Sequence, residues 1–172
     1  MKLKAYAKIN LSLRVFDKRQ DGYHDLESVM QSVSLCDYIT LTLKDSGIEV
    51  VCNDPKVPLG KDNIAYRAAE AFLKAVSSKQ KAPQQSSGQA VSGCRIHIEK
   101  NIPMAAGLAG GSADAAVVLW GLNAEFRMPN DELMKVASGV GSDVPFCLTG
   151  GTCLVKGRGE IVEKQEPWPK TY

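Results

Sequence analysis

Residues 95–122 read RIHIEKNIPMAAGLAGGSADAAVVLWGL and predict a strand, a glycine-rich loop and a helix in direct succession. Ile96 and Ile98 alternate with polar residues, which is typical of a half-buried strand, and the apolar run from Ala113 to Leu122 indicates a helix. A loop that leads into a helix directs backbone N–H groups and the positive end of the helix dipole at one point, where they can bind an anion. The stretch therefore predicts a phosphate site.

The loop itself, Pro103 to Ser112, fits neither of the two commonest nucleotide fingerprints, GxxxxGK[ST] and GxGxxG. A glycine-rich turn can also be purely structural, because glycine is favoured wherever the chain turns sharply. The loop alone therefore leaves two interpretations open, a phosphate site and a plain connection.

Alternating apolar and polar residues predict further strands on both sides of this stretch. In the first of them the apolar residues share one face, which places Lys8 and Asn10 side by side on the other. The turn-prone Asp45-Ser46-Gly47 predicts a hairpin between the second and third. The expected strands cover residues 9–15, 39–43, 48–51 and 152–155.

Helical periodicity appears in the middle of the chain. Asp62 is expected to cap a helix with an apolar stripe from Ile64 to Val76, and a short helix is expected to start near Asn130. Residues 77–93 lack periodicity and are rich in Ser, Gln, Gly and Pro, which predicts a mobile surface loop. This irregular order of strands and helices favours an α+β fold, a two-layer mixed sheet with helices on one side.

Composition excludes several classes of protein. A net charge of +2 over 172 residues gives no basic field for nucleic acid. No apolar run reaches the roughly 20 residues that cross a bilayer, so we expect a cytoplasmic protein without a membrane partner. The five cysteines are odd in number and lack a CxxC pair, which predicts buried free thiols rather than disulfides or a zinc site.

Four motifs favour the phosphate interpretation. Residues 103–116, PMAAGLAGGSADAA, resemble the ATP-binding motif of the galactokinase, homoserine, mevalonate and phosphomevalonate (GHMP) kinases. AKINLSL (7–13), DGYHDL (21–26) and GSDVPF (141–146) resemble the opening strand, the substrate segment and the catalytic-aspartate motif of the branch that acts on 4-diphosphocytidyl-2-C-methyl-D-erythritol. Two shorter stretches match as well, KDNIAYRA at 61–68 and GRGE at 157–160.

The resemblance implies a fold and an activity. The fold is that of the GHMP-kinase amino-terminal domain, which is similar to a ribosomal-protein domain. The activity is ATP-dependent phosphorylation of the 2-hydroxyl of the cytidine compound, in the non-mevalonate route to isoprenoid precursors. On this interpretation residues 1–160 form the ATP-binding domain, with the mobile loop at 77–93. Residues 161–172 then begin a linker or a carboxyl-terminal domain that is cut short.

The resemblance also implies roles for single residues. Asp143 is the expected base that deprotonates or orients the accepting hydroxyl, and Lys8 is its cationic partner near the γ-phosphate. Asn10, Tyr23 and His24 are expected on the substrate side, where the aromatic ring and the imidazole can stack on and hydrogen-bond the cytosine. Without the motifs, Asp143 would read as a turn or cap residue and Lys8 as a solvated charge.

ATP is the expected cofactor, and Mg²⁺ is expected to arrive on its phosphates, because magnesium takes few protein ligands. Two histidines and no clustered carboxylates argue against a metal site made by the protein alone. Asn63 could equally serve a helix terminus, and Ala109 stands where most of the family has glycine. The residues expected to bind ATP are Asn63, Lys100, Pro103, Gly107, Leu108, Ala109, Gly110, Gly111 and Ser112.

Two alternatives stay open at this point. One is another GHMP kinase, such as a homoserine or mevalonate kinase, against which the Gly22-Tyr23-His24 segment argues. The other is an inactive nucleotide-binding fragment, because nothing after Gly159 resembles the start of a further domain. An apolar face should then be exposed where such a domain packs, with self-association, a homodimer included, as its consequence.

Overall fold

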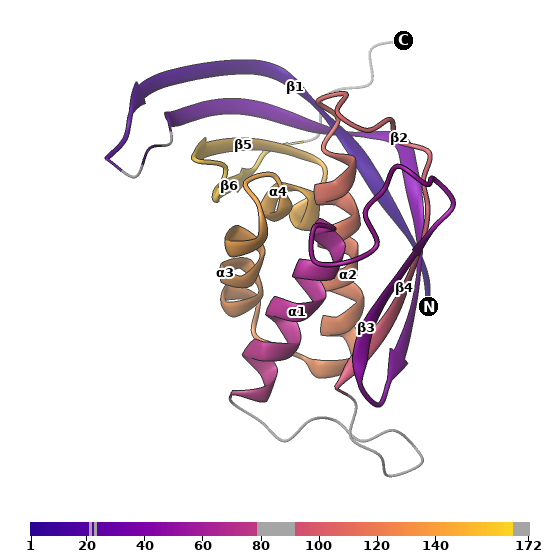
Figure 1. The fold of residues 1–172 in the computed structure, drawn as a ribbon. Coiled ribbons are helices and arrows are strands. Elements are labelled where there is room, and N and C mark those ends of the chain that lie inside the picture. The colour runs from indigo at the N-terminus through magenta and orange to yellow at the C-terminus, as the bar shows by residue number, and fades with distance from the viewer. Residues whose placement is uncertain (21, 23, 79–91, 167–172) are drawn as a thin grey trace.

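The computed structural model describes residues 1–20, 22, 24–78 and 92–166 of the chain. Ten elements follow one another along it (Figure 1). They are β1 (Lys2–Lys18), β2 (His24–Lys44), β3 (Gly47–Cys52), α1 (Ile64–Ser77), β4 (Gly93–Glu99), α2 (Gly110–Phe126), α3 (Asn130–Val140), α4 (Val144–Thr149), β5 (Thr152–Gly157) and β6 (Ile161–Lys164).

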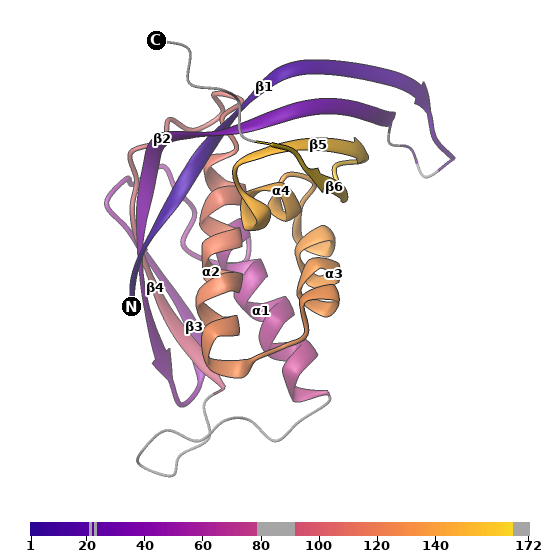
Figure 2. The ribbon, with the colours of Figure 1, turned by 180° about the vertical axis from the view of Figure 1, so that it is seen from behind.

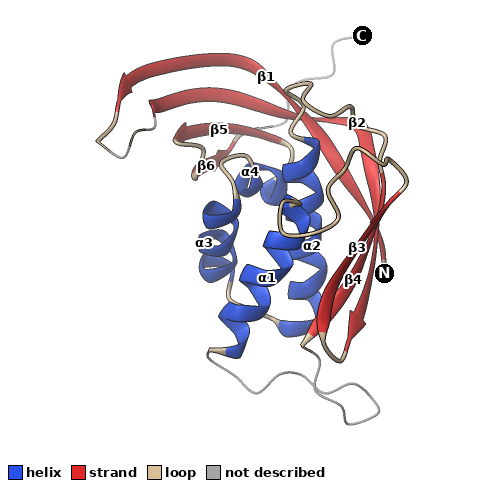
Figure 3. Cartoon of the chain, in the orientation of Figure 1, coloured by secondary structure: helices blue, strands red, loops and turns tan. Residues whose placement is uncertain are grey.

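One mixed sheet holds all the described strands, in the order β3-β4-β2-β5-β6 with β1 paired to β2. The long strand β2 organises the sheet, because its residues 38–44 pair with β4 and its residues 26–31 pair with β5. The four helices lie on one face of this sheet (Figure 3). The predicted α+β fold, two layers with helices on one side, is therefore confirmed.

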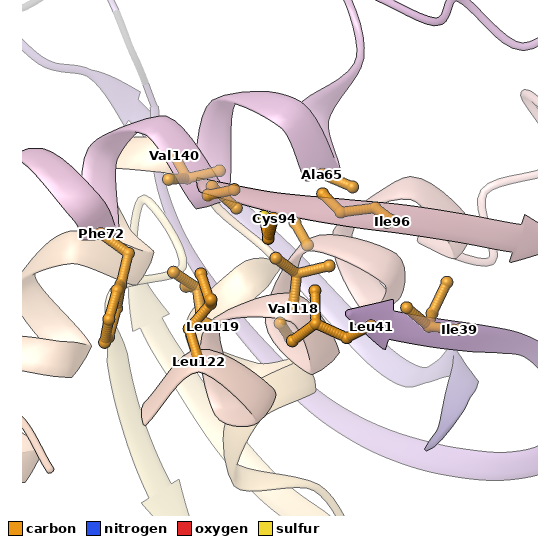
Figure 4. Packing of buried hydrophobic residues seen from close by; sticks show 14 of the residues in the cluster. Ile39, Leu41, Ala65, Phe72, Cys94, Ile96, Val118, Leu119, Leu122 and Val140 are labelled. Carbon is orange, nitrogen blue, oxygen red and sulfur yellow. The ribbon is translucent and has the colours of Figure 1, made fainter. Parts of the chain in front are cut away.

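The core lies between the helices and the part of the sheet formed by β2, β3 and β4 (Figure 4). Helix α2 is buried on most of its circumference, and its small residues let it approach both α1 and the sheet. A Cβ on Gly121 would lie only 2.8 Å from Leu41 Cδ2, so a larger residue here would force the Leu41 side chain to shift. Phe72 of α1 and Phe126 of α2 pack edge to face, with ring centroids 5.7 Å apart.

The predicted hairpin between residues 39–43 and 48–51 is wrong. Strand β4 lies between β2 and β3, antiparallel to the first and parallel to the second. Cys94, Ile96 and Ile98 of β4 are completely buried, so this more apolar strand occupies the central position and β3 the edge. Alternation within a strand predicts its burial, but it does not identify the neighbouring strand.

Two helix starts also differ from the prediction. Asn63, not Asp62, caps α1: its Oδ1 accepts hydrogen bonds from the backbone N–H groups of Ala65 (2.8 Å) and Tyr66 (3.4 Å). Asparagine and aspartate are equally good caps, so the sequence could not choose between neighbours. Helix α4, directly after Asp143, was not predicted, because six residues are too few to show helical periodicity.

The remaining expectations have mixed outcomes. All five cysteines are free as predicted, but only Cys94 and Cys153 are buried, while the other three are partly exposed. Most of the predicted mobile loop at 77–93 lies outside the described residues. Strand β6 pairs with β5 and so joins the start of the segment 161–172 to the sheet. Among the described residues, no helix is long and apolar enough to cross a membrane.

Candidate active site

A cavity of about 500 Å³ opens between the glycine-rich loop, the start of α1 and the first strand. It gathers residues from five separate segments of the sequence, and the loop from Pro103 to Ser112 forms its longest wall. Of the residues predicted from the sequence, the lining contains Lys8, Asn63, Lys100, Pro103, Gly107, Leu108, Ala109, Gly110, Gly111, Ser112 and Asp143.

The loop adopts a backbone that most residues avoid. Ala105, Gly107 and Ala109 all have positive φ, at 56°, 73° and 58°. Ala109 is the N-cap of α2 and lies in the left-handed region, at φ 58° and ψ 30°, where a Cβ costs about 1–2 kcal/mol. The family's glycine would meet this requirement without strain, so the alanine found here is tolerated at an energetic cost.

Two hydrogen bonds fix the loop at its end. The N–H of Ala113 donates to the carbonyl of Ala109 (2.8 Å), which is the start of the helical ladder. The amides of Gly110, Gly111 and Ser112 precede that bond, and helix geometry gives such groups no intrahelical acceptor. The N–H of Lys8 donates to the carbonyl of Leu108 (3.1 Å), which ties the loop to β1. These contacts direct the start of α2 into the cavity.

Lys8 and Asn10 lie side by side, as the alternation predicts. The Lys8 ammonium donates to Asn10 Oδ1 (2.6 Å), and Asn10 Nδ2 donates to Ser28 Oγ on β2 (3.0 Å). The side chain of Lys8 is only 9% exposed, so it is a buried charge rather than a solvated one. Its Nζ lies 3.7 Å from Asp143 Oδ2, within the range of an ion pair. The structure thus brings the two predicted catalytic residues together.

Asp143 stands at the start of α4 and is partly open to the cavity, with 31% of its side chain exposed. Its carbonyl accepts the Cys147 N–H (3.0 Å), which anchors its backbone to the helix. Burial, and next the Asp143 charge, raise the pKa of the Cys147 thiol to about 12. That thiol therefore stays protonated.

The turn that follows β5 packs against Ser142, the residue before Asp143. Gly159 is buried with φ at 122°, and a Cβ there would lie 2.4 Å from the carbonyl oxygen of Ser142. Within the turn, Glu160 Oε2 accepts the N–H of Arg158 (2.6 Å). The GRGE stretch therefore packs directly on the residue before Asp143, and this contact requires glycine.

Lys100 is held by two carboxylates that sequence reasoning missed. Its Nζ donates to Asp37 Oδ2 of β2 (2.5 Å) and to Asp114 Oδ2 of α2 (2.8 Å). Burial lowers the pKa of Lys100, but the two carboxylates outweigh this effect and raise it above its usual value. Its predicted contact with ATP stays a prediction, since its charge is already paired. A lone aspartate within an apolar helix, as in SADAA, was the available signal for Asp114.

Asn63 has little freedom to bind a nucleotide base. Its Oδ1 serves the α1 cap, and its Nδ2 donates to the carbonyl of Pro58 (2.7 Å). The side chain lines the cavity but is 5% exposed, and both ends of its amide have protein partners. The structural role that the sequence allowed is present, and the nucleotide contact stays a prediction.

Of the three predicted substrate residues, Asn10 contacts Lys8, whereas His24 lies elsewhere and Tyr23 falls outside the described part. His24, at the start of β2, is exposed, and its Nδ1 lies 3.0 Å from the carbonyl of Phe16 on β1. Tyr23 is not among the described residues. In Figure 2 the ends of β1 and β2 project beyond the helices as an arm, and His24 does not line the cavity.

Comparison with known proteins now identifies the class. Residues 63–151, more than half of the chain, match the family described as the GHMP kinases N terminal domain. The chain belongs to this family, and the resemblance read from its motifs is confirmed.

Individual relatives narrow the class further. The chain is 46% identical over its whole length to the 4-diphosphocytidyl-2-C-methyl-D-erythritol kinase of Clostridium tetani, and covers 58% of that protein. Over 94% of its length it is 48% identical to the same-named kinase of Acetivibrio thermocellus, of which it covers 54%. It therefore spans little more than half the length of these curated relatives.

Solved structures agree with this placement. A crystal structure of 4-(cytidine 5'-diphospho)-2C-methyl-D-erythritol kinase superposes with a TM-score of 0.74 at 38% identity, over 96% of this chain and 55% of that one. The mevalonate kinase of Methanococcus jannaschii superposes with a TM-score of 0.66 at 15% identity, over 96% and 56%. The second likeness shows the fold alone.

Proposed function

We propose that the chain is the nucleotide-binding part of an enzyme that transfers the γ-phosphoryl group of ATP to the 2-hydroxyl of 4-diphosphocytidyl-2-C-methyl-D-erythritol. One observation carries the proposal: the start of α2 and the Lys8–Asp143 pair open into the same cavity. Phosphoryl transfer needs phosphate donors and a base within one site. The printed names of relatives at 46–48% identity supply the substrate.

Asp143 acts as the base in this proposal. Its carboxylate is partly exposed to the cavity, so a substrate hydroxyl can approach it and give up its proton. The buried ammonium of Lys8, 3.7 Å away, stabilises the negative charge that develops on the transferred group. Asn10 accepts a hydrogen bond from Lys8 (2.6 Å) and so fixes where this charge lies.

The nucleotide binds along the glycine-rich loop. The amides of Gly110, Gly111 and Ser112, with the dipole of the 17-residue helix behind them, bind its phosphates. Magnesium carried on the phosphates would offset their charge. Among the described residues, no group of three or more His, Cys, Asp and Glu side chains is placed to hold a metal.

The test is ADP release by the chain with magnesium, ATP and the cytidine substrate, beside the variant Asp143→Asn. We expect turnover that requires this substrate and falls by a factor of about 10² to 10⁴ in the variant, the usual contribution of a general base. Asp131→Asn is the matched control, because it removes the same charge at an exposed pair with Lys135 on α3. Near-wild-type turnover by Asp143→Asn would refute the assignment of the base.

A second candidate is nucleotide binding without turnover. It is favoured by the position of His24, which is exposed and does not line the cavity, so the acceptor side of the site is the less complete one. Binding of ADP with no ADP release from ATP would support this candidate. Turnover with mevalonate or homoserine instead of the cytidine compound would point to another member of the family.

A further inference from the structure

We propose that Asp114 sets the nucleotide affinity of the site: its carboxylate holds Lys100 beside the start of α2, and its negative charge opposes the phosphates that bind there. The inference rests on the proposed nucleotide binding, but it does not require turnover. It concerns a residue that the mechanism above does not use.

The position of Asp114 connects three elements under the loop. It belongs to the second turn of α2, and its partner Lys100 follows β4 directly, so their 2.8 Å contact joins the two ends of the loop. Asp37 anchors this pair to β2, because it also accepts the N–H groups of Asn101 (2.5 Å) and Ile102 (2.7 Å). The cluster therefore fixes both the entry and the exit of the loop.

The cluster adjoins the place where phosphates would bind. Asp114 and Lys100 both line the cavity together with Gly110 and Ser112. A Cβ on Gly110, the first residue of α2, would lie 3.0 Å from Lys100 Nζ. A phosphate at the helix start is thus close to the ammonium and to the carboxylates behind it.

One oxygen of the cluster has no partner. Asp37 uses both of its oxygens, whereas Asp114 Oδ1 is buried without a hydrogen bond. An unpartnered oxygen of a buried carboxylate costs more than that of a neutral acid. Two carboxylates against one ammonium also leave the cluster with a charge of −1 when both are ionised. Both facts favour the protonated form of Asp114.

The groups around Asp114 set the direction of its titration. Burial raises its pKa to about 7 against the attraction of Lys100, and the negative charge of Asp37 adds to the increase. The thiols of Cys52 and Cys147, whose own pKa values are raised chiefly by burial, stay neutral beside it. The other charged groups that share the cavity are Lys8, Asp62 and Asp143.

These contacts determine how nucleotide affinity should change with pH. Phosphates near Asp114 favour its protonated form, so its pKa is higher with nucleotide bound than without. Binding by the wild type should be tightest below pH 7 and weaken as the pH rises through that value. A rise of one pKa unit on binding corresponds to a tenfold difference in affinity between the two forms.

The experiment compares Mg·ADP binding by calorimetry in the wild type, Asp114→Asn and Asp131→Asn at pH 6 and pH 8.5. Asparagine imitates the protonated acid, because it is neutral and its oxygen can accept from Lys100. We expect Asp114→Asn to bind up to about tenfold more tightly than the wild type at pH 8.5 and equally at pH 6. The exposed control should match the wild type at both values.

A second readout uses the wild type alone. At pH 7.5 we expect fractional proton uptake on Mg·ADP binding, measured in two buffers with different ionisation heats, so the inference stays testable if the variant does not fold. Terminal phosphate groups, with a pKa of about 6, are already ionised at pH 7.5, so the nucleotide itself contributes little to this uptake.

The outcomes separate the two proposals. Equal affinity of Asp114→Asn and wild type at pH 8.5, or weaker binding by the variant at both pH values, overturns the inference while nucleotide binding stands. Binding without proton uptake at pH 7.5 overturns it as well. No Mg·ADP binding by the folded wild type at either pH refutes both proposals together.

Discussion

Replacing Gly159 by alanine should separate the chemical step from nucleotide binding. A Cβ at this position would lie 2.4 Å from the Ser142 carbonyl oxygen, while ordinary contacts begin at 3.4 Å. The turn and the Ser142 peptide must therefore move apart by about 1 Å, and Asp143 is the next residue. A displacement of about 1 Å at a reacting group costs on the order of a hundredfold in rate.

The strain of alanine at a positive φ has to be separated from this displacement. Gly151 provides the control, because its φ is also positive, at 79°, but a Cβ there meets nothing within 4 Å. The backbone alone should cost Gly151→Ala roughly 1–2 kcal/mol of unfolding free energy and Gly159→Ala more, because a φ of 122° lies farther from the left-handed region open to alanine. Only Gly159→Ala should also lose turnover.

The assay measures kcat for the cytidine substrate, the Kd for Mg·ADP and thermal unfolding for each variant. We expect Gly159→Ala to lower kcat by about a hundredfold. Its Kd for Mg·ADP should match that of Gly151→Ala, because neither glycine lines the cavity. If Gly159→Ala keeps more than half of the wild-type kcat, or if Gly151→Ala loses as much, the turn does not position Asp143.

Two further predictions concern the loop and the surface. Ala109→Gly removes left-handed strain but adds conformational entropy to the unfolded state, so it should raise the free energy of unfolding by about 0.5–1 kcal/mol. Urea titration measures this change. Destabilisation would mean that the alanine makes a packing contact that outweighs its strain. Replacing both Leu13 and Val15, which are 54% and 61% exposed, by serine should reduce self-association in sedimentation without lowering the unfolding temperature by more than a few degrees. Unchanged association would locate it on another surface.

Local patterns in the sequence predicted the parts of the fold that depend on neighbouring residues. The strand-loop-helix order around Pro103–Ser112 and the amphipathic α1 are read from spacing alone, and both are present. The pairing of strands is different, because it depends on which distant segment buries a strand best. For that reason the central place of β4 could not be seen in the sequence.

Sequence motifs predicted one part of the site. The residues that only three-dimensional packing brings together were missed. Lys8 and Asp143 lie 135 positions apart in the sequence, and only the family resemblance paired them before their 3.7 Å contact was seen. Asp37 belongs to none of the quoted motifs, and Asp114 lies within the ATP-binding motif at 103–116 without a role assigned to it. Their role depends on meeting Lys100 in a buried place, and burial of a polar residue cannot be read from alternation.

The first strand shows how the site and the exposed apolar surface are connected. Its apolar residues would be expected to face the core, yet Ile9, Leu11 and Leu13 are exposed and Lys8 is buried. Consecutive burial of Ala7 and Lys8 breaks the alternation where the pairing register shifts. Irregularities of this kind re-aim side chains beside active sites.

The register shift also explains why the charged groups gather at this point. It falls within residues 32–36 of β2, between the part that pairs with β5 and the part that pairs with β4. Lys8 lies on β1 opposite one end of this segment, and Asp37 follows its other end. A sheet interrupted here offers room for buried side chains that a regular ladder would fill with apolar ones. The backbone that directs Lys8 into the cavity therefore leaves the neighbouring Ile9 and Leu11 exposed.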